Sequence, residues 1–184
     1  MNRFMIVVNP DKDTDSTVTN RIQSYLEAHG AACMVRDVFH LESSDWEALK
    51  KEQFDCVLVL GGDGTLLRMA GETEDIDIPL FGINLGTVGF LTEGEVANIE
   101  EILDRLLTDD FTIEERMMVT GTVTKADGTT YRKSALNDIV ISRAGFSRLI
   151  GLNVSVDGQV LDTYEADGVV ISTPTGSTGY NLSA

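Results

Sequence analysis

An apolar run at residues 55–60 leads directly into Gly61-Gly62-Asp63-Gly64-Thr65 and then into a helical segment at residues 65–70. Apolar runs without alternation are typical of strands that are covered on both faces, as in parallel sheets. Parallel neighbours need a crossover connection between one strand and the next, and that connection is usually a helix. The order of strand, glycine loop and helix therefore predicts a unit of an α/β fold.

The same alternation of strand and helix extends over the first part of the chain. Strands are expected at residues 4–8, 31–38, 55–60 and 79–84. Helices are expected where apolar residues recur at helical spacing, at residues 16–29, 45–50, 65–70 and 96–107. We therefore predict an α/β domain with an open, mostly parallel sheet over residues 1–108.

The pattern changes after about residue 108. Strands are expected at residues 119–125, 135–142, 152–156 and 169–173, with hairpin turns at Asp127-Gly128 and Asp157-Gly158. Apolar and polar residues alternate within the first and third of these strands, as in half-buried antiparallel strands. We predict a β-rich second domain over residues 109–184, with Met117 and Met118 in its core.

The charge of the chain limits its partners. The 14 Lys and Arg residues against 30 Asp and Glu residues give a net charge of −16, which repels nucleic acid and anionic membrane surfaces. A small anionic ligand then needs local backbone dipoles or a bound cation.

The cysteines and histidines indicate the compartment of the protein and whether it has a zinc site. Cys33 and Cys56 lie in apolar runs, so we expect reduced thiols and a cytoplasmic protein. The apolar run at the N-terminus is too short for a signal peptide or a membrane span. His29 and His40 have no Cys or His neighbours at ligand spacing, so nothing supports a zinc site.

The loop Gly61-Gly62-Asp63-Gly64-Thr65 has the pattern of a phosphate site. Glycines let backbone amides approach phosphate oxygens, and a helix N-terminus attracts anions. No Gly-Lys-Ser/Thr follows, so it is not a Walker loop. An acid beside phosphates suggests that Asp63 binds magnesium or accepts a proton from an attacking hydroxyl. The alternative is that Asp63 only caps the helix.

Three further segments combine polar groups with glycines or strand ends. Residues 173–180, Thr-Pro-Thr-Gly-Ser-Thr-Gly-Tyr, offer hydroxyls and amides for ribose or phosphate and a ring for a base, or they form an ordinary connecting turn. Asn137-Asp138 interrupts an apolar run and suits a nucleoside, or it marks a strand end or bulge. Residues 82–91 contain a second glycine-rich loop, or a glycine-rich crossover, and we expect the side chains of Phe90 and Leu91 to be core contacts.

Taken together, these segments resemble the NAD kinase family, which transfers a phosphoryl group from ATP or polyphosphate to the 2′-hydroxyl of the adenosine ribose of NAD. The resemblance runs through residues 61–65, 82–93, 136–138 and 167–184 in the family's order. It implies an α/β domain, then a sandwich-like all-β domain, with the site between them. It also implies Mg²⁺, NAD and ATP as ligands and a homo-oligomer in the cytoplasm.

The resemblance assigns roles to individual residues. Asp63 matches the family's aspartate, which acts as the general base or orients the 2′-hydroxyl. The residues that would surround the donor phosphates are Gly61, Gly62, Gly64 and Thr65. Those that would bind the dinucleotide are Asn137, Asp138, Asp167, Thr175, Thr178, Gly179, Tyr180 and Ser183. No protein metal ligand is assigned, because Mg²⁺ would be carried mainly by the donor phosphates.

The chain departs from the family pattern at several positions. Asp138 replaces a glutamate and shortens the reach to the ribose, Gly179 replaces a commoner alanine, and Glu165 stands where several members have a basic residue. Family members also continue beyond Ala184, so we expect the second domain to be incomplete and the isolated chain to have little turnover.

Two other classes of function share parts of the pattern. Lipid kinases of the diacylglycerol or sphingosine type use a similar diglycine-aspartate loop, but no membrane-docking stretch is present here. A non-catalytic dinucleotide-binding fragment would retain the fold without the chemistry. The sequence leaves open ATP or polyphosphate as the donor and NAD or NADH as the acceptor.

Overall fold

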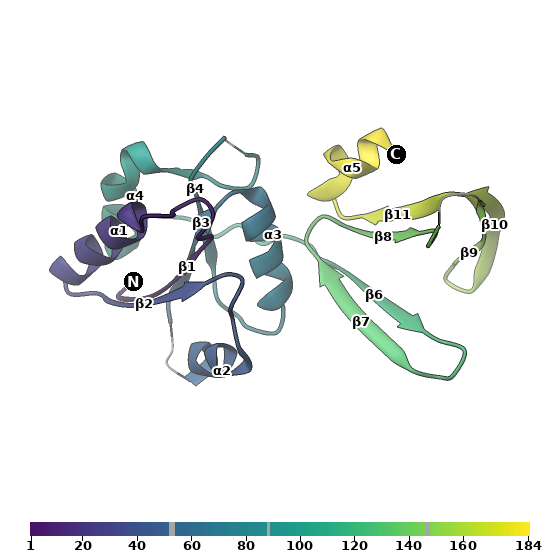
Figure 1. The fold of residues 1–184 in the computed structure, drawn as a ribbon, viewed down its shortest axis with the longest axis horizontal. Helices are drawn as coiled ribbons and strands as arrows, with labels where there is room; N and C mark the ends of the chain where they lie inside the picture. Colours follow the sequence, from purple (N-terminus) through teal and green to yellow (C-terminus); the bar gives the residue numbers. More distant parts are fainter. Residues whose placement is uncertain (52–53, 88, 146–147) are drawn as a thin grey trace. The chain divides into compact units, whose positions relative to one another are not determined.

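The structure is a computed structural model that describes residues 1–51, 54–87, 89–145 and 148–184 (Figure 1). The chain divides into two compact units, Met1–Glu114 and Glu115–Ala184, and each is described by itself.

A five-stranded parallel sheet with the order β2-β1-β3-β4-β5 forms the first unit. Its strands are β1 (Arg3–Val8), β2 (Ala32–Asp37), β3 (Cys56–Gly61), β4 (Leu80–Asn84) and β5 (Gly94–Glu95). The predicted open parallel α/β sheet is thereby confirmed. The sequence pattern did not indicate β5, because a strand of two residues leaves no periodicity to detect.

The helices of this unit cover the two faces of the sheet (Figure 1). They are α1 (Thr17–Ala28), α2 (Ser43–Lys51), α3 (Asp63–Glu72) and α4 (Ile99–Leu107), the last preceded by the 3₁₀ turn η1 (Val96–Asn98). Alternate residues of β1 and β3 face α1 and α4 on one side and α2 and α3 on the other. Every residue of β3 is buried, which explains why this strand is apolar without alternation.

Both cysteines belong to this unit and both are free thiols. Burial raises the pKa of Cys56 in β3 to about 12 and that of Cys33 in β2 to about 11. These thiols are therefore protonated and unreactive at neutral pH. Within the described residues, no helix is long and apolar enough to cross a membrane.

The second unit consists of three antiparallel strand pairs, β6 with β7, β8 with β11, and β9 with β10. The strands are β6 (Val119–Thr124), β7 (Thr130–Ala135), β8 (Asp138–Ser142), β9 (Ile150–Val156), β10 (Gln159–Ala166) and β11 (Gly168–Ser172). The short elements η2 (Gly176–Thr178) and α5 (Tyr180–Ser183) follow. The predicted β-rich second part is confirmed.

The two predicted hairpin turns are also confirmed. Gly128 between β6 and β7 has a φ of +83°, and both Asp157 and Gly158 between β9 and β10 have positive φ. Two consecutive residues with positive φ are typical of a type I′ turn, whose twist suits a two-residue hairpin.

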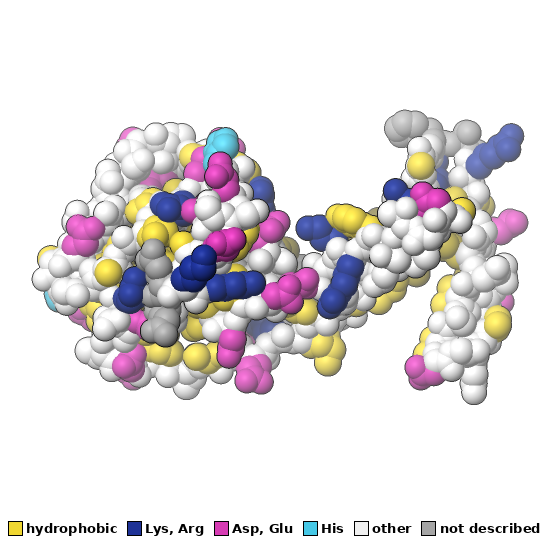
Figure 2. Space-filling model, turned by 90° about the horizontal axis from the view of Figure 1, so that it is seen from below, with side chains coloured by type: hydrophobic (Ala, Val, Ile, Leu, Met, Phe, Trp, Pro, Cys, Tyr) yellow, Lys and Arg dark blue, Asp and Glu magenta, His cyan; other side chains and the backbone are white. Residues whose placement is uncertain are grey.

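Hydrophobic side chains of the second unit are widely exposed (Figure 2). Among its described residues, Leu136 is the only hydrophobic side chain that is buried. The prediction that Met117 is a core residue is wrong, since 68% of its surface is exposed, and Met118 is only partly buried. Both precede β6 in a segment without regular structure, so neither belongs to a strand that packs on a core.

Candidate functional site: a glycine loop and a strand-end cluster

The glycine loop lies where β3 ends and α3 begins. Gly62 is the N-cap residue of α3, has an extended backbone with φ −148°, and provides no side-chain cap. The N–H groups of the first turn of a helix have no intrahelical partners, so this end of α3 can bind an anion. Asp63 does not cap α3, so the alternative of a simple capping aspartate does not describe this loop.

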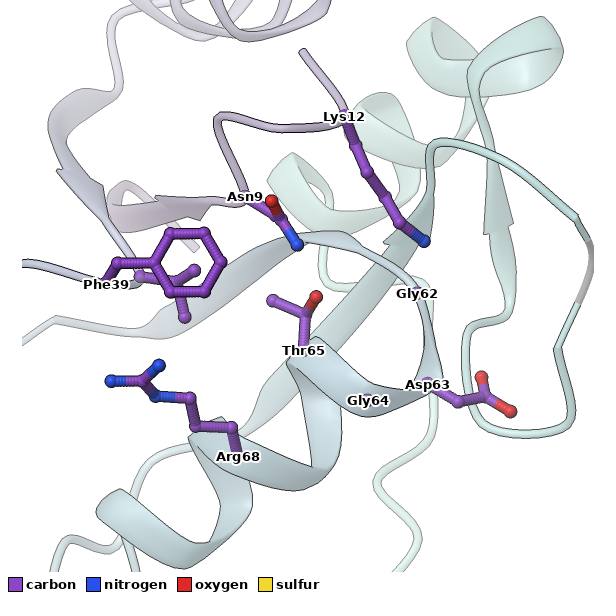
Figure 3. Close-up of a pocket in the computed structure, with 9 residues that line it drawn as sticks. Asn9, Lys12, Phe39, Gly62, Asp63, Gly64, Thr65 and Arg68 are labelled. Atoms are coloured by element: carbon purple, nitrogen blue, oxygen red, sulfur yellow. The ribbon is translucent and has the colours of Figure 1, made fainter. Parts of the chain in front are cut away.

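The loop opens into a pocket with a volume of about 260 Å³ (Figure 3). Its lining residues are Asn9, Lys12, Val38, Phe39, Gly62, Asp63, Gly64, Thr65 and Arg68. Two of them, Lys12 and Arg68, are cations in a chain whose net charge is −16. The pocket therefore combines a helix N-terminus with two positive side chains, which is the local field that an anionic ligand needs.

Lys12 is held over the glycine loop by its own tightly bonded turn. The Asn9 N–H donates to the Leu60 carbonyl at 2.9 Å, and the Lys12 N–H donates to the Asn9 carbonyl at 3.0 Å. The buried carboxylate of Asp13 accepts hydrogen bonds from the Thr19 N–H at 2.8 Å and the Thr19 hydroxyl at 2.6 Å. A Cβ on Gly62 would lie only 2.7 Å from Lys12 Nζ, so the glycine makes room for the ammonium group.

Arg68 comes from the second turn of α3. Its guanidinium carbon lies 5.7 Å from the centre of the Phe39 ring, a cation–π distance that orients the side chain. Figure 3 shows Lys12 extending toward Gly62 and Arg68 extending toward Phe39, from two different elements.

The carboxylate of Asp63 points away from this hollow, toward the loop that follows β4 (Figure 3). Oδ2 accepts the Phe90 N–H at 2.8 Å, and Oδ1 accepts the Leu91 N–H at 3.1 Å and the Thr92 N–H at 3.2 Å. Burial alone would raise the pKa of Asp63, but these hydrogen bonds outweigh it and lower the pKa below its ordinary value. Asp63 is therefore ionised at neutral pH and ties two loops of the sheet edge together.

The second glycine-rich loop fits around this carboxylate. A Cβ on Gly89 would lie 2.1 Å from Asp63 Oδ1, so only glycine allows the approach. Leu91 packs against the core, as predicted, whereas Phe90 is 99% exposed and the prediction of a core contact is wrong there. The Phe90 N–H is turned toward Asp63, and its ring points into solvent. Val88, also in this loop, lies outside the described residues.

In the second unit, the structure brings together two of the segments found in the sequence. The Asn137 carbonyl accepts the Thr173 N–H at 2.8 Å, and the Thr173 hydroxyl donates to the Leu136 carbonyl and accepts the Gly176 N–H. A Cβ on Gly176 would lie 2.2 Å from the Asn137 carbonyl oxygen, so this contact requires glycine. The side-chain oxygen of Asn137 is buried and has no hydrogen-bond partner among the described residues, which leaves an acceptor for a ligand donor.

The other predicted dinucleotide residues lie around the same strand pair. Asp138 begins β8 opposite Ser172, and Thr175 precedes η2. Asp167 lies at the other end of β11, paired with Arg143 at 2.5 Å. Four further predicted residues are exposed and lie on or beside the short elements η2 and α5: Thr178, Gly179, Tyr180 and Ser183. β11 separates Asp167 from Asn137 by five residues, roughly 17 Å of strand.

Several pocket residues were not found by sequence analysis. Asn9, Lys12, Phe39 and Arg68 belong to no motif that we recognised. A signal was present for Lys12, since it follows the first apolar strand at the sheet edge where ligands bind in open α/β folds. Arg68, five residues after Asp63, had no comparable signal.

The site offers few ligands for a resident metal ion. No group of three or more His, Cys, Asp or Glu side chains that could hold a metal occurs among the residues that the structure describes. The carboxylate of Asp63 already accepts three backbone N–H groups.

Comparison with known proteins gives a consistent result for both units. Residues 4–111 match the family model described as the ATP-NAD kinase N-terminal domain, and residues 136–184 match the ATP-NAD kinase C-terminal domain. The chain is 45% identical over 188 residues to the NAD kinase of Lachnoclostridium phytofermentans, covering 100% of this chain and 66% of that protein. It is 42% identical over 187 residues to the NAD kinase of Agathobacter rectalis, covering 100% of this chain and 65% of that protein. The chain thus spans slightly less than two thirds of the length of these curated relatives.

A solved structure shares the fold. The crystal structure of yeast NADH kinase complexed with NADH matches with a TM-score of 0.80 at 22% sequence identity, over 100% of this chain and 60% of that chain.

The glycines of the first loop are predicted to differ in their tolerance of alanine. A Cβ on Gly61 would lie 2.6 Å from Thr65 Cβ, a contact that no rotamer of Thr65 relieves, whereas a Cβ on Gly64 meets nothing within 4 Å. We expect Gly61→Ala to lower the free energy of unfolding by about 1–3 kcal/mol. Gly64→Ala, within α3, should leave it unchanged or raise it by roughly 0.5–1 kcal/mol. Urea unfolding followed by the fluorescence of Trp46 measures both, and equal stabilities would contradict this account.

Proposed function

The chain belongs to the NAD kinase family, and on that premise we propose that it transfers the γ-phosphoryl group of ATP to the 2′-hydroxyl of the adenosine ribose of NAD. The observation that carries the proposal is the Gly61–Thr65 loop, which ends a buried parallel strand, begins α3 and lines a pocket with two cations. This arrangement supports binding of a polyanionic donor in a chain of charge −16.

The donor site is assigned to the pocket of the first unit. Amides of Gly62 and Gly64 would approach the β- and γ-phosphates, with Lys12 and Arg68 neutralising their charge. Mg²⁺ enters as part of the Mg-ATP substrate, which agrees with the usual binding of Mg²⁺ through substrate phosphates and few protein ligands. Polyphosphate presents the same chemistry and is a second donor of this class.

The acceptor site is assigned to the strand-end cluster of the second unit. The buried, unpartnered oxygen of Asn137 supports this, because binding of a ligand N–H or O–H group would satisfy it. Asp138 is assigned to a ribose hydroxyl, and Thr175, Thr178, Gly179, Tyr180 and Ser183 to the adenosine. Asp167, at the far end of β11, is assigned to the other nucleoside. NADH, which the solved yeast kinase binds, offers the same groups.

Asp63 orients the attacking hydroxyl in this mechanism. The 2′-oxygen forms a bond to the γ-phosphorus while the bond to the β–γ bridging oxygen breaks, and ADP leaves with that oxygen. The hydroxyl proton passes to the Asp63 carboxylate and then to water. A carboxylate with a lowered pKa is a weak base, so it receives the proton late, as expected for a loose transition state in which positioning dominates.

The remaining properties are part of the same proposal. Exposed hydrophobic side chains on the second unit support a homo-oligomer, and two free cysteines support a cytoplasmic enzyme.

A single-turnover assay tests the proposed reaction. Enzyme in excess is mixed with NAD and γ-³²P-labelled Mg-ATP, and labelled NADP is separated, so that slow transfer by this shorter chain is still detected. We expect labelled NADP from the wild type and at least a hundredfold slower transfer by Asp63→Asn. Parallel reactions contain NADH or diacylglycerol as acceptor. Labelling of diacylglycerol instead of NAD would contradict the proposal.

Lys12 is predicted to bind the donor and not the acceptor. Removing a cation beside the phosphates in Lys12→Ala should weaken Mg-ATP binding roughly tenfold, with NAD binding unchanged. Isothermal titration of each nucleotide measures this, and Lys50→Ala provides the control because Lys50 is exposed on α2, outside the pocket. Equal Mg-ATP affinity for both variants would remove Lys12 from the donor site.

A further inference from the structure

Thr92 is a buried threonine between β4 and β5 that the function described so far does not use. Only 6% of its surface is exposed. Its N–H and its hydroxyl both donate to Oδ1 of Asp63, at 3.2 and 3.3 Å. Its methyl group packs on the backbone of β4, since a Cβ on Gly82 would lie 2.9 Å from Thr92 Cγ2. The side chain is therefore fixed between the sheet and the carboxylate.

The two oxygens of Asp63 are consequently not equivalent. Oδ1 accepts three donors, from Leu91 N–H, Thr92 N–H and the Thr92 hydroxyl. Among the residues that the structure describes, Oδ2 accepts one donor, the Phe90 N–H at 2.8 Å. An ionised carboxylate offers about four lone-pair sites, two on each oxygen. Oδ1 thus takes part in three of these four hydrogen bonds, two of them from Thr92, and the unused acceptor capacity lies on Oδ2.

We propose that Thr92 is a positioning residue for phosphoryl transfer, which anchors Oδ1 of Asp63 through its N–H and its hydroxyl and so presents the free lone pair of Oδ2 to the acceptor hydroxyl. This inference rests on the proposed function. Thr92 acts through Asp63 and does not itself contact substrate. A carboxylate fixed on one oxygen offers a single direction to the hydroxyl, which is the kind of orientation that in-line transfer needs.

The pKa of Asp63 reports whether the Thr92 hydroxyl donates to its carboxylate. Burial raises the pKa of Asp63, and the donors at Phe90, Leu91 and Thr92 more than offset this. The charged side chains on the neighbouring segments are Lys12 and Arg68, which line the pocket from which the carboxylate points away, and the exposed Glu93, which follows Thr92. Loss of the Thr92 hydroxyl removes a donor to the charged form, so the pKa of Asp63 must rise.

The direct test is a ¹³C NMR titration of the Asp63 carboxyl carbon in the 184-residue chain, assigned with Asp63→Asn. Thr92→Val keeps the methyl packing and removes the hydroxyl, and Thr92→Ser keeps the hydroxyl. We expect the midpoint of the Asp63 titration to lie at a higher pH in Thr92→Val than in the wild type. In Thr92→Ser it should stay at the wild-type pH. Thr92→Ala, a second variant without the hydroxyl, must shift in the same direction as Thr92→Val.

Thr73→Val is the matched control. The Thr73 hydroxyl is also buried and donates to the Met69 carbonyl at 2.9 Å at the C-terminal end of α3, so its removal deletes a buried donor that does not contact Asp63. The Asp63 midpoint should stay at its wild-type value in this variant. A wild-type midpoint in Thr92→Val, or a shift in Thr92→Ser as large as in Thr92→Val, would overturn the proposal.

The titration uses neither NAD nor ATP, so its outcome does not depend on whether the chain shows kinase activity. If no phosphoryl group is transferred to NAD but the Asp63 midpoint shifts in Thr92→Val, the proposed function is wrong, whereas the hydrogen bond from Thr92 to Asp63 is confirmed. Where transfer occurs, Thr92→Val should slow it roughly tenfold without weakening Mg-ATP binding, and Thr92→Ser should restore it. Wild-type transfer by Thr92→Val would overturn the positioning role.

Discussion

The structure of the first unit depends on one strand that is buried on both faces. β3 lies between β1 and β4, and its residues alternate between two hydrophobic clusters, one against α1 and α4 and one against α2 and α3. Because both faces are covered, the strand cannot slip by one residue without exchanging its two clusters. Its last residue, Gly61, therefore lies at a fixed point on the sheet edge. Because the glycine loop and the start of α3 follow directly, the strand also fixes their positions.

The local field at this edge differs from that of the whole molecule. A charge of −16 repels phosphates at long range, yet the edge presents the N-terminus of α3, Lys12 and Arg68. The one acid in the loop, Asp63, is turned toward three backbone amides instead of the pocket. The same hydrogen bonds that keep Asp63 ionised also join the loop after β3 to the loop after β4, so electrostatics and loop geometry are set by one contact.

Much of this organisation was predictable from the sequence. Apolar runs located four of the five parallel strands, and turn residues located both hairpins, because these signals are local. Thr92 was not predictable, since its position follows from its hydrogen bonds to Asp63, which is distant in the chain. For Lys12 the sequence indicated only a place at the sheet edge, and its approach to Gly62 is seen only in the structure. Phe90 was mispredicted because an apolar side chain need not be buried, and here the backbone N–H of that residue determines the local conformation.

The central claim is that the first turn of α3 and the cations facing it bind the donor phosphates. Amide chemical-shift mapping by ¹⁵N–¹H NMR, with inorganic tripolyphosphate and Mg²⁺ added to the ¹⁵N-labelled chain, tests this without turnover. The account predicts saturable shifts at the amides of Gly62, Gly64 and Thr65, with smaller shifts at the amide of Lys12. Shifts confined to residues outside this loop, or no saturable shift at these amides, would contradict it.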